Sequence, residues 1–182
     1  MTIVKNQLVL GTILFAASFC GLDTRADAPL PEYKVKAAIV YKVAKFVNWP
    51  ADSFESSDSP LSLCIAGTDP FGEFIDGIGG QMVQGRPIVV KRVADADLPD
   101  RDCHILFVAS DSDSLRILSR IANRPMLTVG DSAGFAIEGG MLGLQIKDKR
   151  VRFEVNLRAA RDSRLGISAS LLQLARIVEN PE

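Results

Sequence analysis

Apolar residues repeat with a helical period near the start of the chain, from Glu32 to Trp49. Pro31 suits the first turn of a helix, and Trp49 precedes Pro50, a position that disfavours helical backbone. We therefore expect one helix over 32–49. Lys34, Lys42 and Lys45 share one narrow sector, and the apolar side chains spread around most of the remainder. Such a wide apolar arc fits a helix sandwiched between other elements, or a helix with one side against another subunit.

Four short apolar runs of strand length follow, at 61–66, 87–93, 103–109 and 126–129. Two of them end in residues that can start helices. Asp69 can cap a short helix that has Pro70 at its first position. Ser110 and Asp113 have capping-box spacing ahead of a helix over about 111–122. Strands that alternate with helices indicate an α/β sheet with parallel members.

Beyond residue 140, apolar positions alternate with polar or small ones, which is the period of a strand. Folding the chain back around Asp148 and Lys149 gives an antiparallel hairpin with one apolar face, in the pairs Ile146 with Val151, Leu144 with Phe153 and Leu142 with Val155. Because Asp-Lys is not a favoured turn pair, a longer loop also fits. The opposite face carries Arg150, Arg152 and Glu154, and it is either solvated or a binding surface.

The chain closes with two predicted helices, a short one over 157–162 and another over about 168–178 with a single apolar stripe. The Ser- and Asp-rich segment 51–60 is typical of an exposed loop. The pattern therefore predicts a single α/β domain over 29–182, in which a mixed sheet has flanking helices and a C-terminal antiparallel hairpin.

The first 28 residues have the pattern of an export signal. Lys5 gives a positive start, an uncharged and mostly apolar run extends from Leu8 to Phe19, and Ala26 and Ala28 are small residues suited to cleavage. The apolar run is shorter than the roughly 20 residues that a membrane span needs. We expect a signal over 1–28 that is removed, by a cut after Ala26 or after Ala28, and a mature protein that works outside the cytoplasm.

The chain has three cysteines, of which Cys20 lies in the export signal. A lipoprotein anchored at Cys20 is an alternative, although Phe19 before it is bulkier than lipoprotein processing expects. Cleavage leaves Cys64 and Cys103, both within predicted strands. An even pair in an oxidising compartment favours a disulfide over two buried free thiols. On the loop-entropy model, such a bridge contributes roughly 3 to 4.5 kcal/mol to stability.

Charge and histidine content argue against several functions. The chain has 21 basic and 22 acidic residues, and few basic residues lie beside aromatic ones, so nucleic acid is not an expected partner. His104 is the only histidine, and its apolar surroundings favour a structural role. Neither a metal site nor a Ser-His-Asp hydrolase can be assembled around it. We expect no enzyme activity, no cofactor and no metal.

A small-molecule binding module is an alternative function that the fold class suggests. Open α/β sheets bind ligands in a crevice beyond the carboxyl ends of their strands. Asp69, Ser110 and Asp131 follow three of the predicted strands. These three side chains are therefore either part of a ligand crevice or helix caps.

Segments along the whole mature chain match, in order, those of one known family. They are Glu32–Pro50, Leu63–Cys64, Gly67–Gly72, Gly85–Ile88, Cys103–Phe107, Leu127–Val129, Phe135 with Gly139–Met141, Arg152–Leu157, and Ile167–Ser168 with Leu171–Leu172. Through these segments the chain resembles the YfiR family of periplasmic regulators. Cys64 and Cys103 match a cysteine pair that is bridged in this family, whereas a second bridge of some members has no counterpart here.

The resemblance implies a small periplasmic α/β domain, often a homodimer, that represses an inner-membrane diguanylate cyclase by binding its periplasmic sensor region. An outer-membrane lipoprotein would relieve the repression by sequestering the regulator. Low cyclic di-GMP and restrained biofilm formation would be the output.

A repressor of this kind needs an accessible apolar patch with a polar rim. The opening helix and the C-terminal hairpin with its helix have more apolar surface than one small core uses. We expect one of these regions to mediate self-association and the other to contact the cyclase. Arg150, Arg152 and Glu154 are the candidate rim residues.

Overall fold

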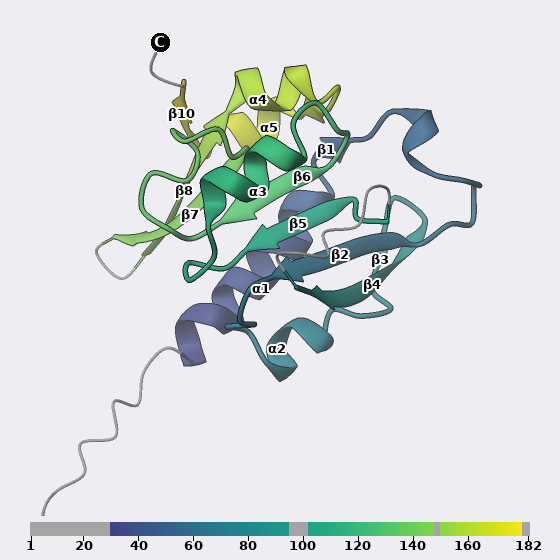
Figure 1. Cartoon of the computed structure of the whole chain (residues 1–182). Coiled ribbons are helices and arrows are strands. Elements are labelled where there is room, and N and C mark those ends of the chain that lie inside the picture. The colour runs from purple at the N-terminus through teal and green to yellow at the C-terminus, as the bar shows by residue number, and fades with distance from the viewer. Residues whose placement is uncertain (1–29, 95–101, 148–149, 180–182) are drawn as a thin grey trace, which may run out of the picture.

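The computed structural model describes residues 30–94, 102–147 and 150–179. The predicted signal with its cleavage positions, Cys20, and the turn at Asp148 and Lys149 lie outside this part. The described strands of the main sheet are Leu61–Ala66 (β2), Met82–Val83 (β3), Arg86–Val93 (β4), Ile105–Val108 (β5), Leu127–Gly130 (β6), Leu142–Lys147 (β7), Arg150–Asn156 (β8) and Arg176–Val178 (β10). They form one eight-stranded sheet in the order β10-β8-β7-β6-β5-β2-β4-β3 (Figure 1).

The middle of this sheet is parallel and its borders are mixed. β4, β2, β5, β6 and β7 run in the same direction, whereas β3 and β8 run antiparallel to their neighbours and β10 runs parallel to β8. The chain steps outward from β2 to β4 and then returns to the other side of β2 to form β5. This is the doubly wound arrangement, in which the direction of winding reverses between β2 and β5. The single α/β domain with a mixed sheet is as predicted.

The described helices are Leu30–Ala44 (α1), Glu73–Asp76 (α2), Ser114–Arg120 (α3), Leu157–Asp162 (α4) and Ala169–Leu172 (α5), with a 3-10 turn at Ala51–Ser53. A separate antiparallel pair joins Val47–Asn48 (β1) to Gly166–Ile167 (β9). In the part of the chain that the structure describes, no helix has the length and apolarity of a membrane span.

Two hydrophobic clusters form the core, one on each face of the sheet. The larger packs α1, through Ala37, Val40 and Val43, against β2, β5, β6, β7 and β8. The smaller packs α3, through Ile117, against the other face and contains both bridged cysteines and Phe135. Figure 1 shows α1 and α3 on opposite faces of the sheet. Strands buried on both sides explain the continuous apolar runs of β2 and β5.

The predicted hairpin register is confirmed. Ile146 pairs with Val151, Leu144 with Phe153 and Leu142 with Val155. The helix over 157–162 is also confirmed, and Asn156 caps it by accepting a hydrogen bond from the backbone N–H of Ala159 at 3.0 Å. The alternation of apolar residues was therefore sufficient to fix this register, because a slip by one residue would turn every apolar side chain to the other face.

The predicted end of the first helix at Trp49 was wrong. α1 ends at Ala44, and the N–H groups of Lys45 and Phe46 bond three residues back, to Lys42 and Val43, in a tightened last turn. The chain then becomes extended, so that fully buried Val47 pairs with Ile167. The pairing with β9, which lies far away in the sequence, overrides the helical period.

The predicted closing helix over 168–178 was also wrong. Ser168 does cap a helix, but α5 ends at Leu172. Residues Arg176 to Val178 form β10 instead, in parallel register with Glu154 to Asn156. Strand formation there satisfies backbone groups along the outer edge of β8, which local periodicity does not reveal.

Two predicted helix starts differ in detail. α3 covers Ser114–Arg120 rather than 111–122, and Asp113 is its cap, since its Oδ1 accepts from the N–H of Arg116 at 3.1 Å. Exposed Ser110 lies before this cap. Asp69 does not cap a helix at Pro70; its Oδ1 accepts from Phe71 N–H at 2.7 Å, and the helix begins only at Glu73.

Candidate functional site

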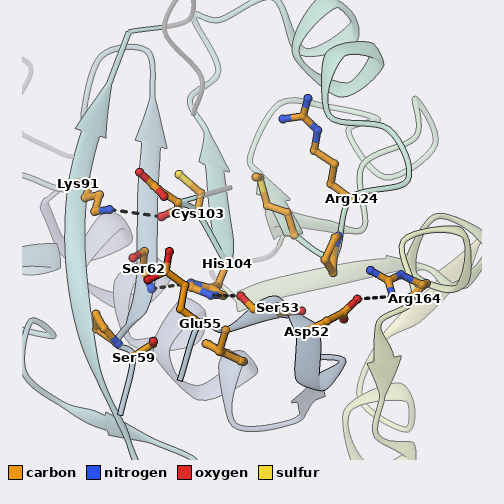
Figure 2. Close-up of a pocket in the computed structure, with 15 residues that line it drawn as sticks. Asp52, Ser53, Glu55, Ser59, Ser62, Lys91, Cys103, His104, Arg124 and Arg164 are labelled. Atoms are coloured by element: carbon orange, nitrogen blue, oxygen red, sulfur yellow. Dashed lines mark hydrogen bonds and ion pairs between the residues drawn. The ribbon is translucent and has the colours of Figure 1, made fainter. Parts of the chain in front are cut away.

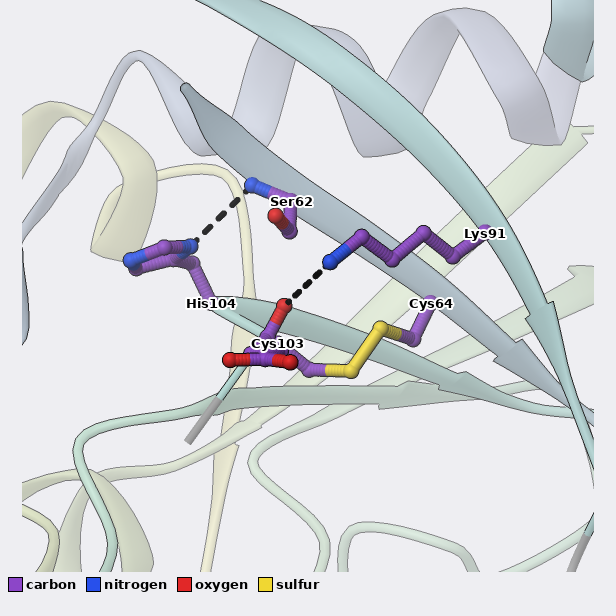
Figure 3. The surroundings of a disulfide bond; sticks show 6 residues. Ser62, Cys64, Lys91, Cys103 and His104 are labelled. Atoms are coloured by element: carbon purple, nitrogen blue, oxygen red, sulfur yellow. Dashed lines mark hydrogen bonds between the residues drawn. A yellow bond between two sulfur atoms is a disulfide. The ribbon is translucent and has the colours of Figure 1, made fainter. Parts of the chain in front are cut away.

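The disulfide joins two neighbouring parallel strands. Cys64 lies in β2, and Cys103 stands two residues before β5. Their Cα atoms are 5.8 Å apart, and Figure 3 shows the bridge between the two strands, close to the side chain of Lys91. Cys64 is fully buried and Cys103 is 5% exposed. The predicted pairing is present, and the two strands are direct neighbours.

The ring of His104 holds two separate segments through its two nitrogens. The backbone N–H of Ser62 donates to Nδ1 at 3.0 Å, and Nε2 lies 2.9 Å from the carbonyl oxygen of Ser53. Because a backbone N–H can only donate, Nδ1 carries no proton, and the neutral ring donates from Nε2. Burial lowers the pKa of His104 below its usual value, so this neutral form is favoured.

The loop after β1 is fixed by a stack of side chains. The ring of Phe54 stacks on the ring of His104, with 4.3 Å between the two centroids. The guanidinium of Arg86 lies over the Phe54 ring, 3.7 Å from its centroid. Arg86 also donates to the carbonyl oxygens of Ser56 and Ser59, at 2.9 and 2.6 Å. The predicted exposed loop over 51–60 is therefore held against the amino ends of β2 and β5.

A cleft of about 820 Å³ lies between this loop and the amino ends of the parallel strands. Figure 2 shows Lys91 and Arg124 on opposite sides of it, with Glu55 and His104 between them. The charged residues of its lining are Asp52, Glu55, Lys91, Asp102, Arg124 and Arg164. Arg164 donates to Asp52 at 2.9 Å. The volume is within the range of small-molecule sites, and the lining offers charges of both signs.

The three residues predicted for a ligand crevice do lie at carboxyl ends of strands. Asp69 follows β2, Ser110 follows β5 and Asp131 follows β6. Asp69 Oδ2, however, accepts from Nε of Arg92 at 2.8 Å. The space next to β2 is occupied as well, because a Cβ added to Gly67 would lie 2.8 Å from Oδ1 of Asp111. The cleft described above lies at the opposite end of these strands.

Asp131 belongs to a buried ion-pair cluster that ties α1 to the end of β6. Its side chain is 2% exposed, and its Oδ2 accepts from Lys36 Nζ at 2.8 Å and from the Tyr33 hydroxyl at 2.9 Å. Lys36 also pairs with Glu32 at 2.5 Å. Burial, with the hydrogen bond to Asp131, raises the pKa of the Tyr33 hydroxyl, which therefore stays protonated as a donor.

Sequence reasoning did not find this cluster or the Phe54 stack. The spacing of Glu32 and Lys36 is that of a helical ion pair, which was an available signal. Asp131 is 95 residues further along the chain than Lys36, and no local pattern joins the two. The stack of Arg86, Phe54 and His104 likewise joins three distant segments.

The candidate rim residues of the hairpin have two different environments. Arg150 and Arg152 are exposed. Glu154 is 7% exposed and pairs with Arg176 of β10, so it is not at an exposed rim. The reason is that β10 pairs with the outer edge of β8. The side chain of Arg176 in β10 therefore contacts Glu154, which would otherwise lie at an open edge of the hairpin. The exposed charge on this face is therefore basic.

These arrangements suit binding better than catalysis. Both nitrogens of His104 are engaged with backbone groups, so the ring can act as a base only if one of those bonds breaks. Among the described residues, His, Cys, Asp and Glu side chains form no group suited to a metal ion. What remains accessible is a polar cleft and several exposed apolar side chains.

A comparison with protein families matches residues 33–176 to the YfiR/HmsC-like family. The match begins in α1 and ends in β10, so it spans the sheet, the disulfide and the cleft. Members of this family are periplasmic regulators rather than enzymes. The chain belongs to the YfiR/HmsC-like family.

Proposed function

We propose that this protein is exported to the periplasm, binds the periplasmic sensor region of an inner-membrane diguanylate cyclase and represses it. The observation that carries the proposal is the family match over 33–176, which covers nearly all of the described fold. A regulator that catalyses no reaction must bind one state of its partner more tightly than the other. Repression would lower cyclic di-GMP and restrain biofilm formation. A homodimer, and release by an outer-membrane lipoprotein, belong to the same proposal.

The test is to delete the gene and measure cyclic di-GMP in the cells. We expect the level to rise and to return when the wild-type protein is supplied. A second strain lacking each candidate cyclase in turn identifies the partner, because its removal should abolish the rise. An unchanged cyclic di-GMP level in the deletion strain would contradict the proposal.

A more specific test of the contact surface changes the two exposed arginines of the hairpin. Replacing Arg150 and Arg152 by Glu should raise cyclic di-GMP if they contact the sensor region, and both side chains are exposed, so the melting temperature should not change. Arg158 and Arg161, two exposed arginines of α4, offer a matched control in which both are replaced by Glu. Full repression by the hairpin double variant would exclude this face as the contact.

A second candidate function is the binding of a small polar molecule, and the cleft of about 820 Å³ favours it. In that case a compound should raise the melting temperature of the wild type. Replacing Lys91 by Ala removes a charged side chain from one side of the cleft. This variant should no longer show the rise in melting temperature with the compound, and its melting temperature without the compound should equal that of the wild type. A shift that persists in Lys91→Ala would place the compound elsewhere.

A further inference from the structure

One flank of α1 carries an apolar stripe that faces solvent. Val35 is 46% exposed, Ile39 is half-buried, and Phe46, just beyond the helix, is 41% exposed. Val35 and Ile39 are one helical turn apart and therefore lie one above the other. Exposed Lys42 follows Ile39 by three residues and places an ammonium in the same stripe. We refer to Val35, Ile39 and Phe46 as the α1 stripe.

The hairpin presents further apolar side chains on the same side of the sheet. Ile146 is 42% exposed, and Val151 and Phe153 are half-buried. They lie on the same face of the hairpin as Leu142 and Val155, which pack in the hydrophobic cluster that contains α1. Ile177 of β10, which is 51% exposed, pairs with Val155 and so points to the same side. Figure 1 shows the hairpin projecting from the rest of the sheet.

The surroundings of these side chains are basic although the whole chain has a net charge of −1. The exposed basic residues on and just after α1 are Lys34, Lys42 and Lys45, whereas the basic residues Lys147, Arg150 and Arg152 lie on the other face of the hairpin. Glu32 is the acidic residue of α1, and it is paired with the buried Lys36. The exposed charge next to this apolar surface is therefore positive.

We propose that the α1 stripe, with Ile146 and Ile177, binds an amphipathic helix with acidic flanks in the periplasmic region of the cyclase. This inference rests on the proposed function and names the partner segment. An apolar sheet face beside a helix is the surface that a further helix covers in α/β proteins. Acidic flanks would complement Lys34 and Lys42. A second copy of the chain would bring lysines against lysines, which disfavours self-association through this surface.

The experiment uses the mature protein and the purified periplasmic region of the cyclase identified by the deletion test. Val35→Glu and Ile177→Glu should each weaken binding about tenfold or more, because a carboxylate would enter the apolar contact and face acidic flanks. Lys34→Glu should weaken it too, and added salt should weaken the wild type. Leu115→Glu is the matched control: Leu115 is 60% exposed but lies on α3, across the sheet, so its binding should equal that of the wild type.

The melting temperature of each variant shows whether weaker binding comes from a lost contact with the cyclase region or from unfolding of the variant. If Val35→Glu does not fold, the binding of Ile177→Glu tests the inference. Wild-type affinity in both Glu variants, or an equal loss in Leu115→Glu, would overturn the inference. So would variants that bind the cyclase region normally but lose dimerisation in sedimentation, or lose adsorption to phosphatidylglycerol vesicles. Failure of the proposed function is distinct, since it appears earlier, as an unchanged cyclic di-GMP level on deletion.

Discussion

Removing the disulfide should cost this protein a large part of its stability. The bridge between Cys64 and Cys103 closes a loop of 39 residues. On the loop-entropy model, a loop of that length stabilises the folded chain by about 4 kcal/mol at 25 °C. Replacing both cysteines by Ala removes the bridge without burying a hydroxyl at these two buried positions. Since folded domains have a net stability of about 5–15 kcal/mol, the variant should fold but unfold much more easily.

The assay is urea unfolding followed by circular dichroism, for the wild type, for Cys64→Ala with Cys103→Ala, and for the wild type with reductant. We expect the double variant to lose about 3–4 kcal/mol and the melting temperature to fall by roughly 6–16 °C. Reduced wild type should unfold somewhat less easily than the double variant, because both lack the crosslink but the alanines also lack two buried sulfur atoms. A loss below about 1 kcal/mol would refute the reasoning, since the bridge would then not constrain the unfolded chain.

Three further predictions concern single positions. Because burial lowers the pKa of His104, the unfolded chain takes up a proton below about pH 6.5 that the folded chain does not. The stability of the protein should therefore fall as pH falls through that region. In urea unfolding at pH 7.5 and 5.5, His104→Asn should show a smaller difference in stability between the two pH values than the wild type. Asp131→Ala should cost about 3 kcal/mol in urea unfolding, because it leaves a buried lysine without this partner. Gly140→Ala should lower stability by about 1–3 kcal/mol, because the new methyl group would overlap the buried ring of Phe135, whereas Gly77→Ala, which meets only ordinary contacts, should stay close to the wild type by the same measurement.

Local patterns predicted the elements whose partners lie close in the sequence. The hairpin register followed from alternation alone, since β7 and β8 are consecutive and one face is buried. The cysteine pair followed from its parity and from the apolar runs around it. In both cases one dominant physical requirement, burial of one face or an oxidising compartment, leaves few alternatives.

The errors lie where the partner is far away in the sequence. α1 stops at Ala44 because Val47 pairs with Ile167, and the last predicted helix gives way to β10 because Arg176 to Val178 pair with β8. Helix propensity differs among ordinary residues by less than about 1 kcal/mol per residue, so a few strand hydrogen bonds and a buried side chain override it.

The candidate site was predictable only in part for the same reason. Topology placed Asp69, Ser110 and Asp131 at carboxyl ends of strands, but ion pairs with Arg92 and Lys36 engage the two acids. The cleft at the amino ends depends on the loop that Phe54 anchors on His104. A loop packed by an aromatic stack between distant segments carries no periodic signal, so composition indicated only that it was a loop.

Stability and partner binding should be separable in this fold. The disulfide packs in the cluster with α3, whereas the α1 stripe and Ile177 lie on the other side of the sheet. A loss of about 4 kcal/mol raises the unfolded fraction roughly a thousandfold, yet it leaves most molecules folded if the initial stability exceeds about 6 kcal/mol. The Cys64→Ala, Cys103→Ala variant should therefore bind the cyclase region with the affinity of the wild type, measured at 25 °C by titration calorimetry. In cells its half-life should be shorter, because proteolysis follows the unfolded population. A variant that stays folded but binds at least tenfold more weakly would contradict this separation, and would place the contact on the side of the bridge.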